Sequence, residues 1–142
     1  MIKVFLGALL AIGLTFGGSW TTAQAADPVV SSGSPGLLYE FDAFSRRGVT
    51  IADNGLLEVR RDGCWNATMD VLNETDMDRS VTIIIRFHNR RGRHYTSLVV
   101  ADGLDLGPVA TSDVVASGCN ARLARVFHRL RLHSVSRVLS VH

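Results

Sequence analysis

Arginine is the residue type whose chemistry and spacing point most directly to a binding surface in this chain. A guanidinium group binds a carboxylate or a phosphate through two parallel hydrogen bonds, so several arginines on one face favour an anionic ligand. Seven arginines of the second half fall in two short segments that would form one face if the segments are neighbours in the fold. The predicted anion-binding residues are Arg86, Arg90, Arg91, Arg93, Arg125, Arg129 and Arg131.

The distribution of charge along the chain also favours an anionic partner. Residues 26–85 carry ten acidic side chains and five arginines, a balance of −5, whereas residues 86–142 carry three acidic side chains and nine arginines, a balance of +6. Such an asymmetry suits an anionic polysaccharide, a lipid head group or an acidic protein. Nucleic acid is less expected, because no aromatic side chains alternate with these arginines to stack bases. The alternative is an ordinary solvated surface, partly paired with the acids of the first half.

Other side chains with chemical potential lack the pattern that a catalytic or metal site needs. His88 and His94 flank a short loop at a spacing that permits two metal ligands, but no cysteine or carboxylate adjoins them in sequence. Asp76-Met77-Asp78 and the pair Asp102 and Asp105 do not match the alternating oxygen ligands of an EF-hand loop. No nucleophile motif or phosphate-binding loop is present. We therefore expect no catalytic residues, no metal and no cofactor.

The first 25 residues have the three parts of a secretory signal. Lys3 gives a positive start, residues 4–16 are an apolar run, and Ala23-Gln24-Ala25 places small residues before a cleavage site after Ala25. The apolar run is shorter than a membrane-spanning helix needs to be. The sequence therefore predicts a periplasmic or secreted protein with no transmembrane segment after cleavage.

The rest of the chain has the length of one domain behind a short lead-in. Residues 26–36 are rich in serine, glycine and proline and are expected to be flexible. Residues 37–142 are expected to form the folded domain. Oligomeric state does not follow from the sequence.

Two cysteines, Cys64 and Cys119, are the only ones in the sequence. Outside the reducing cytosol they are free to pair, and their spacing differs from the Cys-x-x-Cys of a catalytic redox pair. Two reduced buried thiols or a redox pair are the alternatives. We expect a structural disulfide.

Alternating apolar residues predict several β-strands. Residues 65–71 and 81–87 each place an apolar side chain at every second position, as in half-buried strands. Asn89 to Arg93 has the length and the glycine of a hairpin loop. Asn54-Gly55 between two apolar runs predicts another hairpin. Further strands are expected at residues 37–44, 94–100 and 113–117.

The segment before the C-terminus fits two structures. Leu123, Val126, Phe127 and Leu130 have the spacing of one helix face, whereas residues 129–133 alternate as a strand does. The strand-rich context favours a strand over residues 127–135, with Arg125, Arg129 and Arg131 along one face. A short helical turn over residues 120–125 is compatible with that strand.

Short strands separated by turns at roughly ten-residue spacing predict an all-β, antiparallel β-sandwich of about seven strands. The second half resembles the immunoglobulin-like β-sandwich modules of secreted bacterial proteins, especially those related to FxLYD domains. The residues that carry the resemblance are Val71-Leu72-Asn73, residues 81–87, residues 89–92 and Leu106-Gly107-Pro108. The resemblance implies an immunoglobulin-like fold and an extracytoplasmic binding or assembly role. We expect a binding module without catalytic activity, or alternatively a structural or assembly subunit, or a chaperone, that pairs through an exposed strand edge.

Overall fold

The computed structural model describes residues 21–26, 28–30 and 36–142. Most of the predicted signal peptide therefore lies outside the described residues. The described elements, in chain order, are β1 (Thr21–Ala26), β2 (Pro28–Val30), β3 (Leu37–Phe41), β4 (Phe44–Arg46), β5 (Val49–Ile51), β6 (Gly55–Val59), β7 (Cys64–Asn73), β8 (Arg79–His88), β9 (His94–Leu106), β10 (Thr111–Cys119), α2 (Ala121–Val126), the 3-10 helix η1 (Phe127–Leu132) and β11 (Ser134–Val141).

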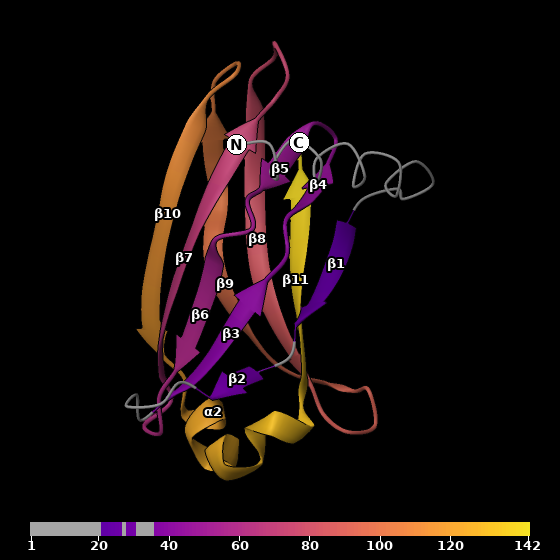
Figure 1. Cartoon of the computed structure of the whole chain (residues 1–142). Helices are drawn as coiled ribbons and strands as arrows, with labels where there is room; N and C mark the ends of the chain where they lie inside the picture. The colour runs from indigo at the N-terminus through magenta and orange to yellow at the C-terminus, as the bar shows by residue number, and fades with distance from the viewer. Residues whose placement is uncertain (1–20, 27, 31–35) are drawn as a thin grey trace.

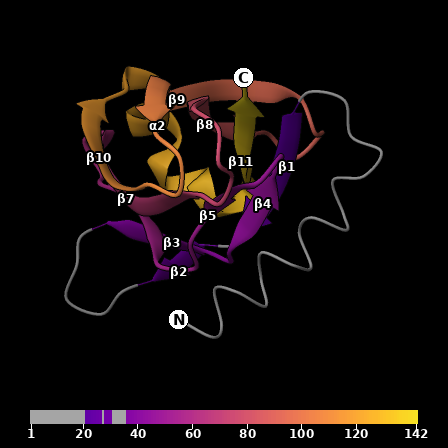
Figure 2. The same cartoon turned by 90° about the horizontal axis from the view of Figure 1, so that it is seen from above.

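The strands form two antiparallel sheets, so the expected all-β class is confirmed. One sheet has the order β1-β11-β8-β9. The other has the order β2-β3-β6-β7-β5-β4, and β10 pairs with β7. The two layers are seen edge-on in Figure 2. The described residues hold eleven strands rather than about seven, because the first half of the chain is divided into short segments.

Apolar side chains from both sheets make one core between the layers. The alternation predicted for residues 65–71 and 81–87 is present, because every second residue of β7 and β8 is buried over these spans. The core joins residues of β3, β6, β8 and β11, among them the fully buried Tyr39, Leu57 and Leu139. Burial of this apolar surface is the main force that holds the two sheets together.

The predicted disulfide is confirmed. Cys64 opens β7 and Cys119 ends β10, and the two residues lie directly opposite each other in the antiparallel pair. The two strands pair over their whole shared length, from Thr111 opposite Leu72 to the cysteines. The bridge therefore closes a long antiparallel ladder at the point where the chain enters α2.

The predicted hairpin at Asn54-Gly55 is wrong. β5 and β6 do not pair with each other, and both pair with consecutive parts of β7. The intervening residues form a bulge, in which Ala52 donates its N–H to the carbonyl of Asp70 and the Asn54 amide donates to the Asp70 carboxylate. Position 55 needs a glycine for close packing and not for a hairpin turn. A Cβ there would lie 2.8 Å from Nη1 of the buried Arg137.

The expected strand over residues 127–135 is also wrong, because this segment is helical until Leu132. Asn120 caps α2 by accepting hydrogen bonds from the N–H groups of Arg122 and Leu123. Leu123 and Leu130 are fully buried against the sheets. The helical spacing of these two leucines decides the local structure, and not the alternation of Arg129 to His133. A helix places both leucines on the face that covers the end of the core.

β1 crosses the predicted cleavage site. Its six residues pair with β11 from Thr21 opposite Ser140 to Ala26 opposite Val135. Cleavage after Ala25 would remove five of these six pairs. Within the expected lead-in, Pro28–Val30 forms β2 and pairs with β3. Among the described residues, no helix has the length and apolarity needed to cross a bilayer.

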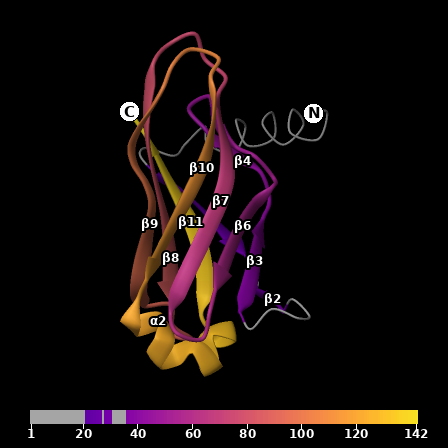
Figure 3. The same cartoon turned by 90° about the vertical axis from the view of Figure 1, so that its left-hand side faces the viewer.

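The two ends of the long strands carry different segments (Figures 1 and 3). We call residues 89–93 and 120–133 the helix end, which holds the β8–β9 hairpin loop, α2 and η1. We call residues 74–78 and 107–110 the loop end, which holds the β7–β8 and β9–β10 loops. β8 runs from one end to the other. Its ten residues place the two ends about 30 Å apart.

Candidate anion-binding site

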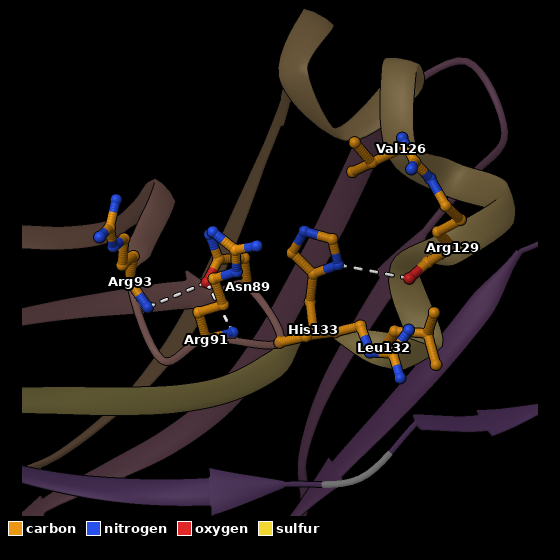
Figure 4. A pocket seen from close by; sticks show the side chains of 8 residues that line it. Asn89, Arg91, Arg93, Val126, Arg129, Leu132 and His133 are labelled. Carbon is orange, nitrogen blue, oxygen red and sulfur yellow. Dashed lines mark hydrogen bonds between the residues drawn. The ribbon is translucent and has the colours of Figure 1, made fainter.

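A pocket of about 340 Å³ opens at the helix end, between the β8–β9 loop and the helical segment (Figure 4). This volume is near the lower end of the range of about 300–1,000 Å³ that small-molecule sites occupy. Four arginines from two distant parts of the sequence meet there. The lining residues are Asn89, Arg90, Arg91, Arg93, Val126, Arg129, Leu132 and His133.

Asn89 fixes the shape of the hairpin loop. Its side-chain oxygen accepts hydrogen bonds from the N–H groups of Arg91 and Arg93, at 2.9 and 3.0 Å. Its backbone N–H donates to the carbonyl of Arg93, and its carbonyl accepts from Gly92. An asparagine that bonds to the backbone two residues further on stabilises a tight turn. The loop therefore holds its arginines on a defined backbone.

The opposite wall is attached to the sheet through α2. The Tyr95 hydroxyl donates to the carbonyl of Arg122, and Arg122 Nη1 donates to the carbonyl of Tyr95. The capping Asn120 also donates from its amide to the hydroxyl of Thr96. Since Tyr95 and Thr96 follow the hairpin loop directly in β9, these bonds hold the helical wall at a fixed distance from the loop.

His133 ends the helical wall. Its Nδ1 lies 3.3 Å from the carbonyl oxygen of Arg129, as Figure 4 shows, and its ring contacts that of Tyr95 edge-on at 5.1 Å between centroids. The backbone N–H of His133 donates to the carbonyl of Leu130. These contacts orient the ring beside the pocket and couple it to the sheet.

The pocket has a strongly positive lining. Its lining residues include four arginines and no aspartate or glutamate. In the part of the chain that the structure describes, none of these four arginines forms an ion pair with an acidic residue. Val126 and Leu132 add an apolar surface, and Leu132 remains 48 % exposed. Exposed cations around an apolar patch can attract an anion and also bind an attached apolar group.

The structure brings together four of the seven arginines singled out from the sequence, namely Arg90, Arg91, Arg93 and Arg129. The other three are exposed but lie outside the pocket lining. Arg86 is on β8, paired with Ser97 of β9 and Ser136 of β11. Arg125 and Arg131 belong to α2 and η1, so the expectation that they share one strand face with Arg129 is wrong.

Sequence reasoning missed the residues that shape the pocket. His133 is not among the predicted site residues, and Asn89 is predicted only as part of a hairpin loop. The signal for Asn89 is its place before an Arg-rich turn that contains a glycine, where asparagine commonly bonds to the backbone. Val126 and Leu132 become pocket residues only once the segment is helical.

His88 and His94 are neighbours in the structure. The rings of His88 and His94 contact each other edge-on at 6.1 Å between centroids, and His94 Nε2 lies 2.7 Å from the hydroxyl of Ser97. Within the described ranges no group of three His, Cys, Asp or Glu side chains is placed to hold a metal ion. The pair adds two imidazole side chains next to the Arg-rich loop.

Two other arginines, Arg46 and Arg137, are buried in the core and take no part in the pocket. The Arg137 guanidinium lies over the rings of Phe41 and Phe44, at 4.4 and 5.4 Å, and donates to the carbonyl of Asp42 at 2.6 Å. Burial lowers its pKa to about 9, against the opposing effect of the Asp42 charge. This side chain joins the sheets and is not accessible to a ligand.

Comparisons with known proteins give no family for this chain. No family model, no curated protein and no solved structure matches it. The function must therefore be inferred from the pocket itself, and the resemblance to FxLYD-related modules stays a prediction.

Proposed function

We propose that the protein is a non-catalytic binding module that holds a carboxylate, phosphate or sulfate group of its partner in the Arg-lined pocket. The observation that carries this proposal is the convergence of four arginines on one pocket without a carboxylate among its lining residues. The candidate partners are an anionic polysaccharide, a lipid head group or an acidic protein.

The physical basis is the cost of placing like charges together. Several guanidinium groups around one small pocket repel each other, and an anion relieves this repulsion while accepting charge-assisted hydrogen bonds. The Asn89 loop and the Tyr95–Arg122 contacts hold the backbone of both walls in place before a ligand arrives. Less conformational freedom is then lost on binding.

The lining residues also favour binding over catalysis. They include one histidine, His133, but no serine, cysteine, aspartate or glutamate that could act with it as a nucleophile or as a second acid–base group. The ring nitrogen Nδ1 of His133 faces a backbone oxygen, which orients the ring. The histidine therefore serves as one more polar contact for the ligand.

The compartment that suits this module is the periplasm or the extracellular medium. A structural disulfide is typical of oxidising compartments, and the first 25 residues have the pattern of a cleaved secretory signal. The two antiparallel sheets with a shared core are compatible with an immunoglobulin-like sandwich. Such modules commonly bind through the loops at one end of the sandwich.

The test compares two double variants with equal loss of charge. Arg91→Gln/Arg93→Gln removes two pocket cations, whereas Arg60→Gln/Arg61→Gln removes two exposed arginines of the β6–β7 turn. Binding to polyphosphate, to a polyuronate and to vesicles with anionic lipid is measured at low and high salt. We expect the pocket variant to lose about tenfold in affinity and the control to lose less than about twofold. Equal losses would contradict a site at the pocket and indicate only a diffuse charge effect.

A second function is favoured by the edge of β11. If the signal is cleaved after Ala25, β11 loses nearly all of its pairing with β1. The strand has no proline, lysine or acidic residue to discourage another strand, and its one charged side chain, Arg137, is buried. The mature chain would then act as an assembly subunit or chaperone that accepts a strand at this edge.

This second function has its own test. The chain that starts at Ala26 is compared with the chain that starts at Thr21, by sedimentation and by hydrogen exchange of the β11 amides. Edge pairing predicts concentration-dependent oligomers of the shorter chain that resist high salt and protect the β11 amides. A monomeric shorter chain that binds no added strand peptide would refute it.

A further inference from the structure

We propose that the pocket binds the acidic tip Asp76-Met77-Asp78 of a second copy of this chain, so that copies associate head to tail. This inference rests on the proposed function, because it assumes that the pocket binds anionic groups, and it identifies the partner as an acidic protein segment. The tip lies in the β7–β8 loop, at the loop end of the molecule.

The acidic tip presents two carboxylates around an apolar side chain. Asp76, Met77 and Asp78 are all exposed, and Met77 keeps 57 % of its surface accessible. Among the described residues, neither Asp76 nor Asp78 has an ion pair or a side-chain hydrogen bond. The nearby Glu74 differs, since its carboxylate accepts a hydrogen bond from Thr50. The two tip carboxylates are therefore free for a partner, and Met77 is a large exposed apolar side chain between them.

Asn73 holds the acidic tip in shape. Its amide nitrogen donates to the carbonyls of Met77, Leu106 and Gly107, at 2.7, 3.2 and 2.8 Å. Its side-chain oxygen accepts from both the N–H and the hydroxyl of Thr75. The asparagine is almost fully buried, so these bonds are shielded from water. The tip therefore keeps one conformation and loses little freedom on docking.

The pocket complements this tip in charge and in polarity. Arg91, Arg93 and Arg129 offer bidentate sites for two carboxylates, while Val126 and Leu132 offer an apolar surface for the methionine. The pocket is concave, whereas the tip projects from its end of the molecule (Figure 1). A rigid, projecting acidic loop with one apolar side chain is the kind of partner that an apolar pocket rimmed by arginines fits.

The acidic tip and the pocket of one chain cannot meet, because the ten residues of β8 separate them. The contact must therefore form between copies. It joins different surfaces of the two partners, so it is heterologous, and each added copy leaves one free tip and one free pocket. Unless the rotation between copies closes a ring, the product is an open chain of molecules.

The first experiment measures sedimentation of the mature chain over a range of concentrations, with two charge variants and a control. We expect the wild type to form species larger than a dimer at low salt and to dissociate at high salt, because exposed ion pairs are screened. Asp76→Asn/Asp78→Asn and Arg91→Gln/Arg93→Gln should each weaken association about tenfold. Asp102→Asn/Asp105→Asn removes equal charge from β9 and should change it less than about twofold.

The deciding experiment mixes the two interface variants in equal amounts. The tip variant retains a normal pocket and the pocket variant retains a normal tip, so each pair can form a single contact. We expect a one-to-one dimer and no larger species.

Three results would overturn the inference: a wild type that stays monomeric up to about 1 mM, a tip variant that associates as the wild type does, or a mixture that gives no dimer. These failures are distinct from failure of the proposed function. That function fails if Arg91→Gln/Arg93→Gln loses no more affinity for polyanions than the Arg60→Gln/Arg61→Gln control does.

Discussion

The disulfide allows the contribution of one bond to the stability of the fold to be predicted and tested. Replacing both cysteines, as Cys64→Ser/Cys119→Ser, opens a loop with a sequence separation of 55 residues. In the chain-entropy description, a bridge that closes a loop of this length stabilises the folded state by about 4 kcal/mol through its effect on the unfolded chain. We expect the double variant to lose about that much free energy of unfolding.

The folded site should survive the same change. β7 and β10 pair along their whole shared length, and Asn120 is held independently by bonds to Gly63 and Thr96. The bridge therefore acts mainly on the unfolded chain, and α2 keeps its place without it. Affinity for anions, measured where the variant is still folded, should change less than about twofold, because no pocket residue loses a contact.

Urea unfolding followed by circular dichroism measures the loss. With a slope of about 1–2 kcal/mol per molar for a domain of this size, the midpoint should fall by about 2–4 M. The reduced wild-type protein is the control and should unfold at the same midpoint as the variant. A loss below about 1 kcal/mol would refute the entropic argument. A large loss of anion affinity would show instead that the bridge positions the pocket directly.

Three further predictions concern strain and charge. A hydrogen bond with Asp70 and the charge of Asp70 raise the pKa of Asp113, so the stability that the protonated pair gives is lost as pH rises through this pKa. Asp113→Asn should therefore raise the melting temperature at neutral pH but not at acid pH, and an equal shift at both pH values would contradict this. Val109→Asn should raise the free energy of unfolding, measured in urea, by about 0.5–1 kcal/mol, because a β-branched residue at φ 53° is strained and asparagine is less so. An unchanged free energy of unfolding would argue against strain at this position. Gly63→Ala should lower the free energy of unfolding by at least about 2 kcal/mol more than Gly92→Ala does, because both glycines have positive φ but only a Cβ at Gly63 would clash with the backbone, at the carbonyl oxygen of Asn120. Similar urea midpoints for the two variants would refute the clash.

The parts of the fold that could be predicted are those in which a local pattern and the core agree. β7 and β8 alternate strictly because one face of each is buried along its length, and this period is visible in the sequence. The pairing of Cys64 with Cys119 followed from their number and the expected compartment. For the strands, the nearby residues contain the information that decides the structure, and for the disulfide, the presence of only two cysteines leaves a single possible pairing.

The parts that could not be predicted depend on distant partners. Asn54-Gly55 is a hairpin signal, but β7 is long enough to pair with the strands on both sides of it, so the chain bulges and continues. The alternating residues 129–133 have the pattern of a strand. Their helical structure depends on the two buried leucines, Leu123 and Leu130, which close the end of the core. Neither the length of the pairing strand nor the open end of the core can be read from the local sequence.

The helical structure of this segment also changes what the arginines can recognise. In a strand, Arg129 and Arg131 would project from the same face and extend a flat basic surface. Of the two arginines of η1, only Arg129 is among the residues that line the pocket, together with Val126, Leu132 and the Asn89 loop. A flat surface of seven cations would favour long polyanions of almost any kind, through charge alone. A pocket with four cations and an apolar patch should favour a compact group that carries both carboxylates and an apolar side chain. Binding of a peptide that contains Asp-Met-Asp should therefore resist added salt better than binding of polyphosphate, because its apolar contact is not screened.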